Sequence, residues 1–209
     1  MSWMFNECES LNDLDISNFK TKKVENRICM FNRCESLKNL NLSNLDAQNV
    51  INMICMFWGC ESLTNINFKN FRTDKIVNME SMFHGCVKLD NLDLSDFKTK
   101  KVENMLNMFT ECKSLKNLNI KSFRTPKVKS MKEMFFRCSS LKVLDLSNFT
   151  AESLLNMDGM FADMKSLISL DLSNFNVGKE TSMNWLFAGT QKLKKNNVKA
   201  KNQIIKDQI

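Results

Sequence analysis

A phenylalanine recurs every 26 residues along this chain, and this repeat constrains the fold more than any other feature. The repeated residues are Phe5, Phe31, Phe57, Phe83, Phe109, Phe135, Phe161 and Phe187, without insertion or deletion between copies. Other columns of leucine, isoleucine and phenylalanine keep the same step. A unit this short cannot bury an apolar face alone, so neighbouring copies must stack and share one continuous core. The chain is therefore predicted to form a repeat solenoid.

One copy, Met82 to Asn107, indicates how each unit is built. Its segment Asn91–Ser95 alternates polar and apolar residues, which is typical of a half-buried strand. The apolar residues between Val102 and Cys112 follow helical spacing. Parallel strands stack about 4.8 Å apart, whereas helices need about 8–10 Å. We therefore expect a curved α/β horseshoe of the leucine-rich-repeat class, with parallel strands on its concave face and short helical or 3-10 segments on its convex face.

The repeat pattern divides the chain into two regions. Residues 1–188 are predicted to form the solenoid, with repeats counted from Met4. Residues 189–209 are predicted to be a degenerate C-terminal repeat that serves as a basic cap, because Asn196 stands where the strand leucine is expected. The net charge of the chain is +7. This C-terminal region carries most of that charge, so the solenoid itself is nearly balanced.

The repeat resembles a known family. The run Ser140–Phe149, SLKVLDLSNF, and the run Lys101–Met105, KVENM, are similar to the 26-residue variant of the BspA-like leucine-rich repeats of bacterial surface proteins. This resemblance implies a secreted or cell-surface protein without enzymatic activity that binds host proteins, extracellular matrix or other cells. No signal peptide precedes the first repeat, so the chain is expected to be a fragment of a longer array or, alternatively, a cytoplasmic protein.

The composition argues against several functional classes. No apolar run approaches the roughly 20 residues of a membrane-spanning helix, so no membrane insertion is expected. His84 is the only histidine, which leaves little material for a catalytic pair. We expect no catalytic residue, no cofactor and no metal site, because a regular solenoid spreads its ionisable groups in columns and does not gather them in one pocket.

The cysteines form a column rather than a metal-binding motif. Its members are Cys8, Cys34, Cys60, Cys86, Cys112 and Cys138. No close pair of the C-x₂-C type occurs, so free thiols that pack as small hydrophobic groups are expected. Cys29 and Cys55 belong to another column, in which other copies carry polar residues. These two thiols are therefore predicted to be exposed and more reactive.

The outward positions of the strands provide a candidate binding face. It is predicted to comprise Asp15, Asn41, Asn67, Asp93, Asn119, Asp145 and Asp171, together with Ser17, Ser43, Lys69, Ser95 and Lys121. A broad polar face of this kind suits a protein or a glycan held by many modest contacts. The alternative is structural, since stacked Asn and Asp side chains also satisfy one another and the neighbouring backbone.

A second candidate surface is basic and follows the turn after each strand. It is predicted to comprise Lys20, Lys23, Arg72, Lys75, Lys98, Lys101, Arg124 and Lys127. Stacking would align these residues as a stripe that attracts a sulfated glycan or another polyanion. The alternative is a solvated face. Nucleic acid is disfavoured, because no aromatic side chains alternate with the basic ones for base stacking.

Exposed aromatic residues form a third group. Trp58 and Phe136 stand in an otherwise polar or small column, which suggests a contact spot on the convex side; its other members are Asn6, Asn32, His84, Thr110, Ala162 and Ala188. Trp3 and Trp185 are expected to cover the ends of the stack. The sequence therefore predicts a non-enzymatic protein-interaction or adhesion module, with polyanion binding or a structural spacer as alternatives. A monomer or a weak end-to-end dimer is expected, because the first repeat exposes a strand edge.

Overall fold

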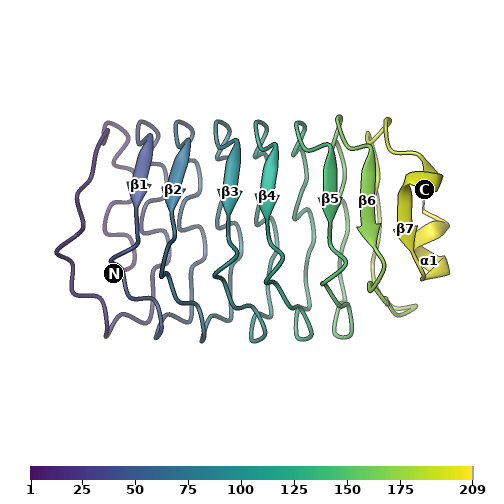
Figure 1. Cartoon of the computed structure of the whole chain (residues 1–209), viewed down its shortest axis with the longest axis horizontal. Helices are drawn as coiled ribbons and strands as arrows, with labels where there is room; N and C mark the ends of the chain where they lie inside the picture. The colour runs from purple at the N-terminus through teal and green to yellow at the C-terminus, as the bar shows by residue number, and fades with distance from the viewer. Residues whose placement is uncertain (209) are drawn as a thin grey trace.

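The chain is a parallel β-solenoid in which each 26-residue repeat makes one coil, and the coils stack in a row (Figure 1). The computed structural model describes residues 1–208. Its strands are β1 (Asn39–Asn41), β2 (Asn65–Asn67), β3 (Asn91–Asp93), β4 (Asn117–Asn119), β5 (Val143–Asp145), β6 (Ser169–Leu172) and β7 (Val198–Ala200). A 3-10 turn, η1 (Lys195–Asn197), and a short helix, α1 (Gln203–Lys206), complete the elements. The predicted repeat solenoid with parallel strands is confirmed.

Two lines of backbone pairing hold the coils in register. On the strand side, Leu40 pairs with Ile66, and Leu144 pairs with Leu170. On another side of the coil, single parallel bridges link Asn26, Asn52, Asn78, Asn104, Ser130, Asn156 and Ser182 in succession. Each residue therefore lies beside its equivalent in the next repeat, so the columns of the sequence are ladders in space.

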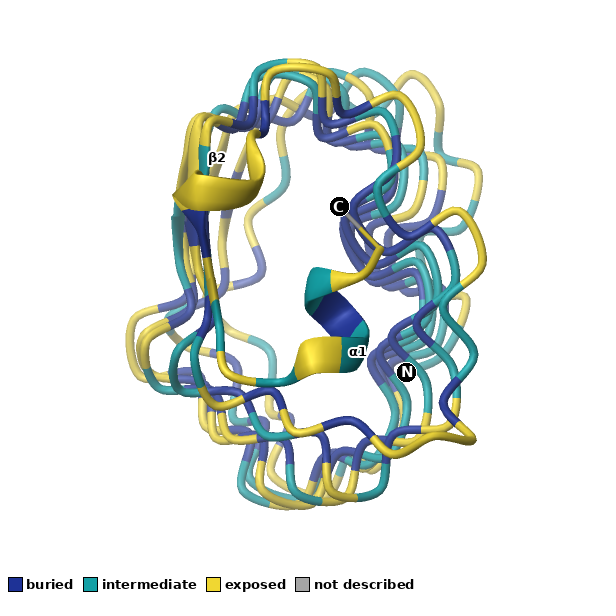
Figure 2. Ribbon diagram, turned by 90° about the vertical axis from the view of Figure 1, so that its right-hand side faces the viewer, coloured by how far each residue is buried: buried dark blue, intermediate teal, exposed yellow. Residues whose placement is uncertain are grey.

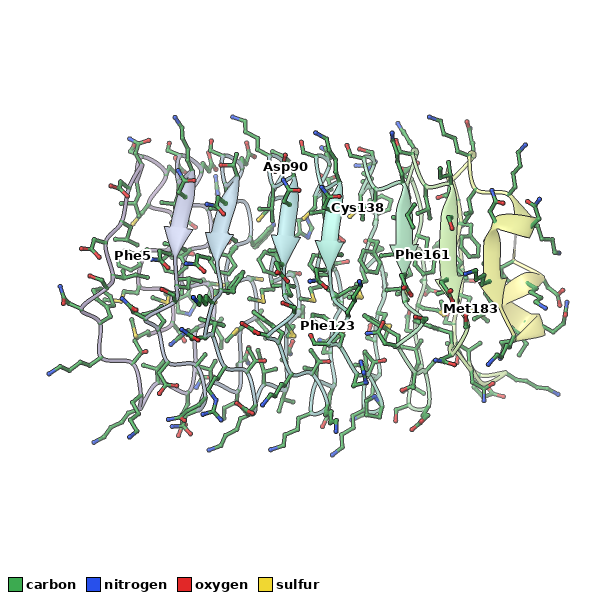
Figure 3. The ribbon with its side chains drawn as sticks, in the orientation of Figure 1. Phe5, Asp90, Phe123, Cys138, Phe161 and Met183 are labelled. Atoms are coloured by element: carbon green, nitrogen blue, oxygen red, sulfur yellow. The ribbon has the colours of Figure 1, made fainter. Side chains whose placement is uncertain are left out.

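Phenylalanine rings fill the interior between the two sides of each coil. The rings of Phe57 and Phe83 stack with 5.4 Å between centroids, and those of Phe135 and Phe161 with 6.2 Å. Phe68 enters from the strand side and meets Phe57 edge-on at 6.0 Å. Figure 3 shows the labelled Phe123 and Phe161 within the stack. This close ring stacking joins successive coils, together with the buried leucine and methionine columns.

The predicted helical segments are wrong. The backbone N–H of Phe31 donates to Met56 O in the next coil at 2.9 Å, whereas the N–H of Asn32 donates to Cys29 O in its own turn. Cys29 and Arg33 both adopt left-handed backbone angles, with φ of 51° and 55°. Apolar residues three apart mark tight turns here. The coils stack too closely for helices, because the axes of packed helices need about 8–10 Å between them.

The horseshoe prediction is wrong for the same reason. Without helices, both sides of each coil have the spacing of stacked backbone, so no difference in width bends the stack. Concave and convex faces do not arise, and the coils lie side by side along the long axis (Figure 1). No helix among residues 1–208 has both the length and the apolar character needed to cross a membrane.

The last coil departs from the repeat spacing. Leu170 pairs with Val198 rather than with Asn196, because η1 inserts extra residues ahead of β7. Helix α1 then lies across the open end of the final coil (Figure 2). Its Ile205 side chain is fully buried, and Asn202 caps its first turn by accepting from the Ile204 N–H at 3.0 Å. Residues 195–206 thus cover the C-terminal end of the core.

Candidate functional site

The predicted Asp and Asn face has a clear structural role at the end of each strand. In each member the side-chain Oδ1 accepts the backbone N–H two residues later, as Asp93 does from Ser95 at 2.9 Å. The same turn is made by Asp15, Asn41, Asn67, Asn119, Asp145 and Asp171. These residues therefore shape the exit from the strand, and their outer edges face solvent.

A groove lies over β3 and β4 and reaches the first residue of β5, so it spans the unpaired seam between β4 and β5. Backbone pairing divides the strands into three sheets, β1–β2, β3–β4 and β5–β6–β7. The groove has a volume of about 720 Å³ and is lined by Asn91, Leu92, Asp93, Lys116, Asn117, Leu118, Asn119, Lys121, Ser140, Lys142 and Val143. It brings together Asp93, Asn119 and Lys121 of the predicted face. The other predicted residues of that face lie along the stack outside it.

A change in one side-chain ladder coincides with the groove. Asn117 donates from Nδ2 to Asn91 Oδ1 at 2.6 Å, so an amide pair joins β3 to β4. The next residue of the column is Val143, which has no amide and is 60% exposed. Below the groove the coils remain joined, because Asn148 Nδ2 donates to the carbonyls of Ile120 and Phe123 at 3.0 and 2.9 Å. The opening is therefore confined to the strands.

The groove carries unpaired positive charge. Lys116, Lys121 and Lys142 are exposed, and none of them forms an ion pair within residues 1–208. Asp93 is the acidic residue of the lining. The sequence interpretation missed Lys116 and Lys142. They precede β4 and β5 at one repeat position, which holds Thr64, Asp90 and Ile168 in other copies, so two lysines in successive copies were the available signal.

Asp171, at the far end of the same face, shows how a paired carboxylate behaves here. Burial alone would raise the pKa of Asp171. Hydrogen bonds from Ser173 and the nearby Lys199 ammonium outweigh burial and hold this pKa below its ordinary value. Lys199 Nζ lies 3.4 Å from the Asp171 carboxylate. The lysines of the groove have no such partner.

The predicted basic stripe lies at the corners that follow the strands, and all eight of its residues are exposed. Its centre is partly neutralised, because Arg72 and Lys98 each lie 3.1 Å from the Asp74 carboxylate. Their hydrogen bonds, that of Lys98 first, hold the pKa of Asp74 below its usual range. Lys75 donates to Asn49 at 2.8 Å, and Arg124 donates to the Phe123 carbonyl. Lys20, Lys23, Lys101 and Lys127 have no acidic partner within residues 1–208.

The cysteine column is a ladder of thiol hydrogen bonds. Cys60 Sγ donates to the Phe31 carbonyl of the preceding coil at 3.0 Å, and Cys138 does the same to Phe109 at 3.1 Å. Figure 3 shows Cys138 among the interior side chains. All eight cysteines are free, and burial raises the pKa of Cys112 to about 12. Within residues 1–208, no cluster of three or more ligand side chains is arranged to hold a metal.

The structure does not support exposed thiols at Cys29 and Cys55. Cys29 is only 5% exposed, and Cys55 is half-buried. Burial is the main cause that raises the pKa of both thiols, to about 12 for Cys55. A raised pKa lowers the fraction of reactive thiolate. Their column is polar in other copies because it lies in a left-handed turn, as at Ser81, which is also buried.

A threonine column was not recognised from the sequence. Thr73, Thr99 and Thr125 are buried, and each hydroxyl bonds the next coil twice. Thr99 Oγ1 donates to the Arg124 carbonyl and accepts the Arg124 N–H, both at 2.8 Å. A period of 26 in threonine was the available signal. These buried contacts stabilise the stack and are not available to a ligand. The strand groove therefore remains the candidate binding site.

Comparison with known proteins corrects the family resemblance. A family model described as "Mycoplasma protein of unknown function, DUF285" matches residues 1–65, 30–144 and 116–207. No curated protein matches the chain. The assignment to BspA-like leucine-rich repeats is therefore wrong, and with it the surface location and the adhesive role lose the support of that resemblance.

Proposed function

Because the chain belongs to the DUF285 family, whose function is unknown, we propose its role from its surface alone. It is a non-enzymatic interaction module that holds an acidic segment of a protein partner in the groove between β4 and β5. The observation that carries this proposal is the gathering of Lys116, Lys121 and Lys142, without acidic partners among the described residues, around an opening of about 720 Å³.

The chemistry of the groove suits an acidic peptide. Its lysines attract carboxylates, and its Asn side chains offer amide donors and acceptors. Leu118 is only partly buried, and Val143 is exposed, so the floor also accepts apolar side chains. The charge supports fast association and orientation, while these apolar contacts add affinity.

A catalytic role has less support. Catalysis requires an acid, a base or a nucleophile gathered at one place. The Asp93 carboxylate accepts the Ser95 N–H and so shapes the turn after β3. The groove lining contains no histidine or cysteine. His84 lies against Trp58 instead, with 5.7 Å between the ring centroids.

Polyanion binding by the basic stripe is the second candidate function. The observation that favours it is the set of exposed lysines without acidic partners among residues 1–208, such as Lys23, Lys101 and Lys127. A sulfated glycan would follow such a stripe along several coils. A third possibility, a structural spacer, needs neither surface to bind.

Two variants with the same change in charge distinguish binding by the groove from binding by the stripe. K116Q/K121Q/K142Q alters the groove, and K23Q/K101Q/K127Q alters the stripe. Binding to immobilised poly-L-glutamate and to heparin is measured at low and at physiological salt, with far-UV circular dichroism as the control for folding.

We expect the groove variant to lose at least about tenfold in affinity for poly-L-glutamate, and the stripe variant to change little. The opposite pattern, with heparin preferred and only the stripe variant affected, would assign the function to the stripe. Failure of the wild-type chain to bind either probe would favour the spacer.

A further inference from the structure

A second depression lies on the outer side of the last three coils, away from the strand groove. It has a volume of about 450 Å³ and is lined by Glu133, Phe136, Gly159, Ala162, Asp163, Trp185, Ala188 and Gly189. We propose that it binds a small organic cation that carries an alkylated ammonium group. This site is independent of the proposed partner groove.

Neighbouring columns of the repeat create the depression. In the column of Phe136 the next two copies carry Ala162 and Ala188, so a phenyl ring is followed by two methyl groups. The floor beside them is backbone at Gly189, which adopts a left-handed φ of 72°. A Cβ at Gly189 would collide with the Asp163 carboxylate. The small residues Ala162, Ala188 and Gly189 thus leave a hollow beside the Phe136 ring.

Aromatic rings contribute to the walls of this hollow. Trp185 is 77% exposed, the largest exposed fraction among the large apolar side chains of residues 1–208. Phe136 contributes from two coils earlier and is half-buried. Aromatic faces attract cations through the ring quadrupole, most strongly when the cation is an alkylated ammonium that sheds water readily.

The charges around the hollow favour a cation. Glu133 and Asp163 both line it, whereas no basic residue does. Each carboxylate also has one basic neighbour at ion-pair distance outside the lining, with Lys132 at 3.7 Å from Glu133 and Arg137 at 3.5 Å from Asp163. The Arg137 guanidinium itself lies over the Phe136 ring, 4.8 Å from its centroid. The chain therefore already places a cation on one of these rings.

The test compares two ligands that differ in charge alone. Choline and its neutral isostere 3,3-dimethylbutan-1-ol are titrated separately into the full chain by isothermal titration calorimetry. We expect choline to bind at least about tenfold more tightly than the alcohol. Equal binding of the two ligands, or no binding of choline, would overturn the proposal.

Three variants locate the site. W185A removes a wall, and A188F fills the hollow with a side chain that the same column already holds at Phe136. Both are expected to abolish choline binding. W58A removes another exposed tryptophan, which lies outside the depression, and should leave binding unchanged. If W58A abolishes binding and W185A does not, the cation binds elsewhere and the proposal fails.

Discussion

The guanidinium of Arg27 lies over the ring of Phe71, with 5.2 Å between Cζ and the ring centroid. Arg27 is fully buried and stands in a column of methionines that includes Met53 and Met79. The coil between Phe19 and Phe71 has Leu45 where the others have a phenyl ring. The planar guanidinium thus takes up space in the ring stack where a phenyl group is missing.

Replacing this buried cation should stabilise the protein. Arg27 Nη2 donates to the Asp46 carbonyl at 2.7 Å, but Nε and Nη1 have no hydrogen-bond partner within residues 1–208. The double variant R27M/L45F restores the residue types of the other coils, and we expect it to raise the free energy of unfolding by about 1–3 kcal/mol. Urea denaturation measures this change. A loss of stability would mean that the stacked guanidinium contributes more than its burial costs.

The advantage of that variant should depend on pH. Burial lowers the pKa of Arg27 to about 10, despite the opposing field of Asp46, from an ordinary value of 12.5. The unfolded state therefore binds more protons between these two values, and wild-type stability gains with pH in that window. The stability difference between R27M/L45F and the wild type should accordingly shrink above about pH 10. Parallel denaturation curves from pH 8 to 11 check this, and a constant difference would contradict it.

The thiol ladder should tolerate a hydroxyl better than a methyl group. Cys86 Sγ donates to the Phe57 carbonyl at 3.2 Å, and Thr190 makes the equivalent bond to Phe161 in the last coil. C86T keeps a donor, whereas C86V has the same shape without one. We expect C86V to be less stable than C86T by about 1 kcal/mol in urea denaturation. Equal stability of the two variants would mean that the cysteines contribute through packing alone and not through hydrogen bonds.

The buried threonine column offers a comparison with its own control. T99V removes a hydroxyl that both donates to and accepts from the Arg124 backbone. We expect it to lower the free energy of unfolding by about 1–3 kcal/mol. The control is T150V, because Thr150 Oγ1 is buried without a hydrogen-bond partner among residues 1–208. If both variants lose the same amount, the hydrogen bonds of Thr99 are not the cause.

The turns at the strand ends require an acceptor but no charge. Asp93 Oδ1 accepts the Ser95 N–H at 2.9 Å, and Asn67 makes the same bond to Lys69 at 3.0 Å. D93N should therefore leave stability nearly unchanged, whereas D93A should lower it by about 1 kcal/mol. Thermal unfolding of the two variants provides the measurement. A large loss in D93N would show that the charge itself matters.

The sequence predicted the features that follow directly from its period. Strands such as Asn91–Asp93 were recognisable from alternating polarity, and the columns gave the register. The helical interpretation failed because apolar residues three apart, as at Met105 and Met108, fit tight turns as well as a helix. The distinction depends on which carbonyl accepts each backbone N–H. Here the acceptor lies in the next coil, as when the Phe109 N–H donates to Met134 O.

The groove could be predicted from the sequence only in part. The polar residues Asp93, Asn119 and Lys121 were recognised, but the absence of backbone pairing between β4 and β5 is a property of the packed stack. The shift to Val198 was also missed, since Asn196 holds the position that counting by 26 assigns to the strand. Periodicity describes an ideal coil, and both features are departures from it.

The interrupted sheet makes the stiffness of the molecule uneven around its axis. Bridges run without a gap from Asn26 to Ser182, whereas strand pairing is absent between β2 and β3 and between β4 and β5. Bending that opens the strand side therefore breaks no backbone hydrogen bond at these two seams, while the bridged side serves as a hinge line. The proposed binding groove therefore lies at a seam, and a rotation about the bridged side would change its width.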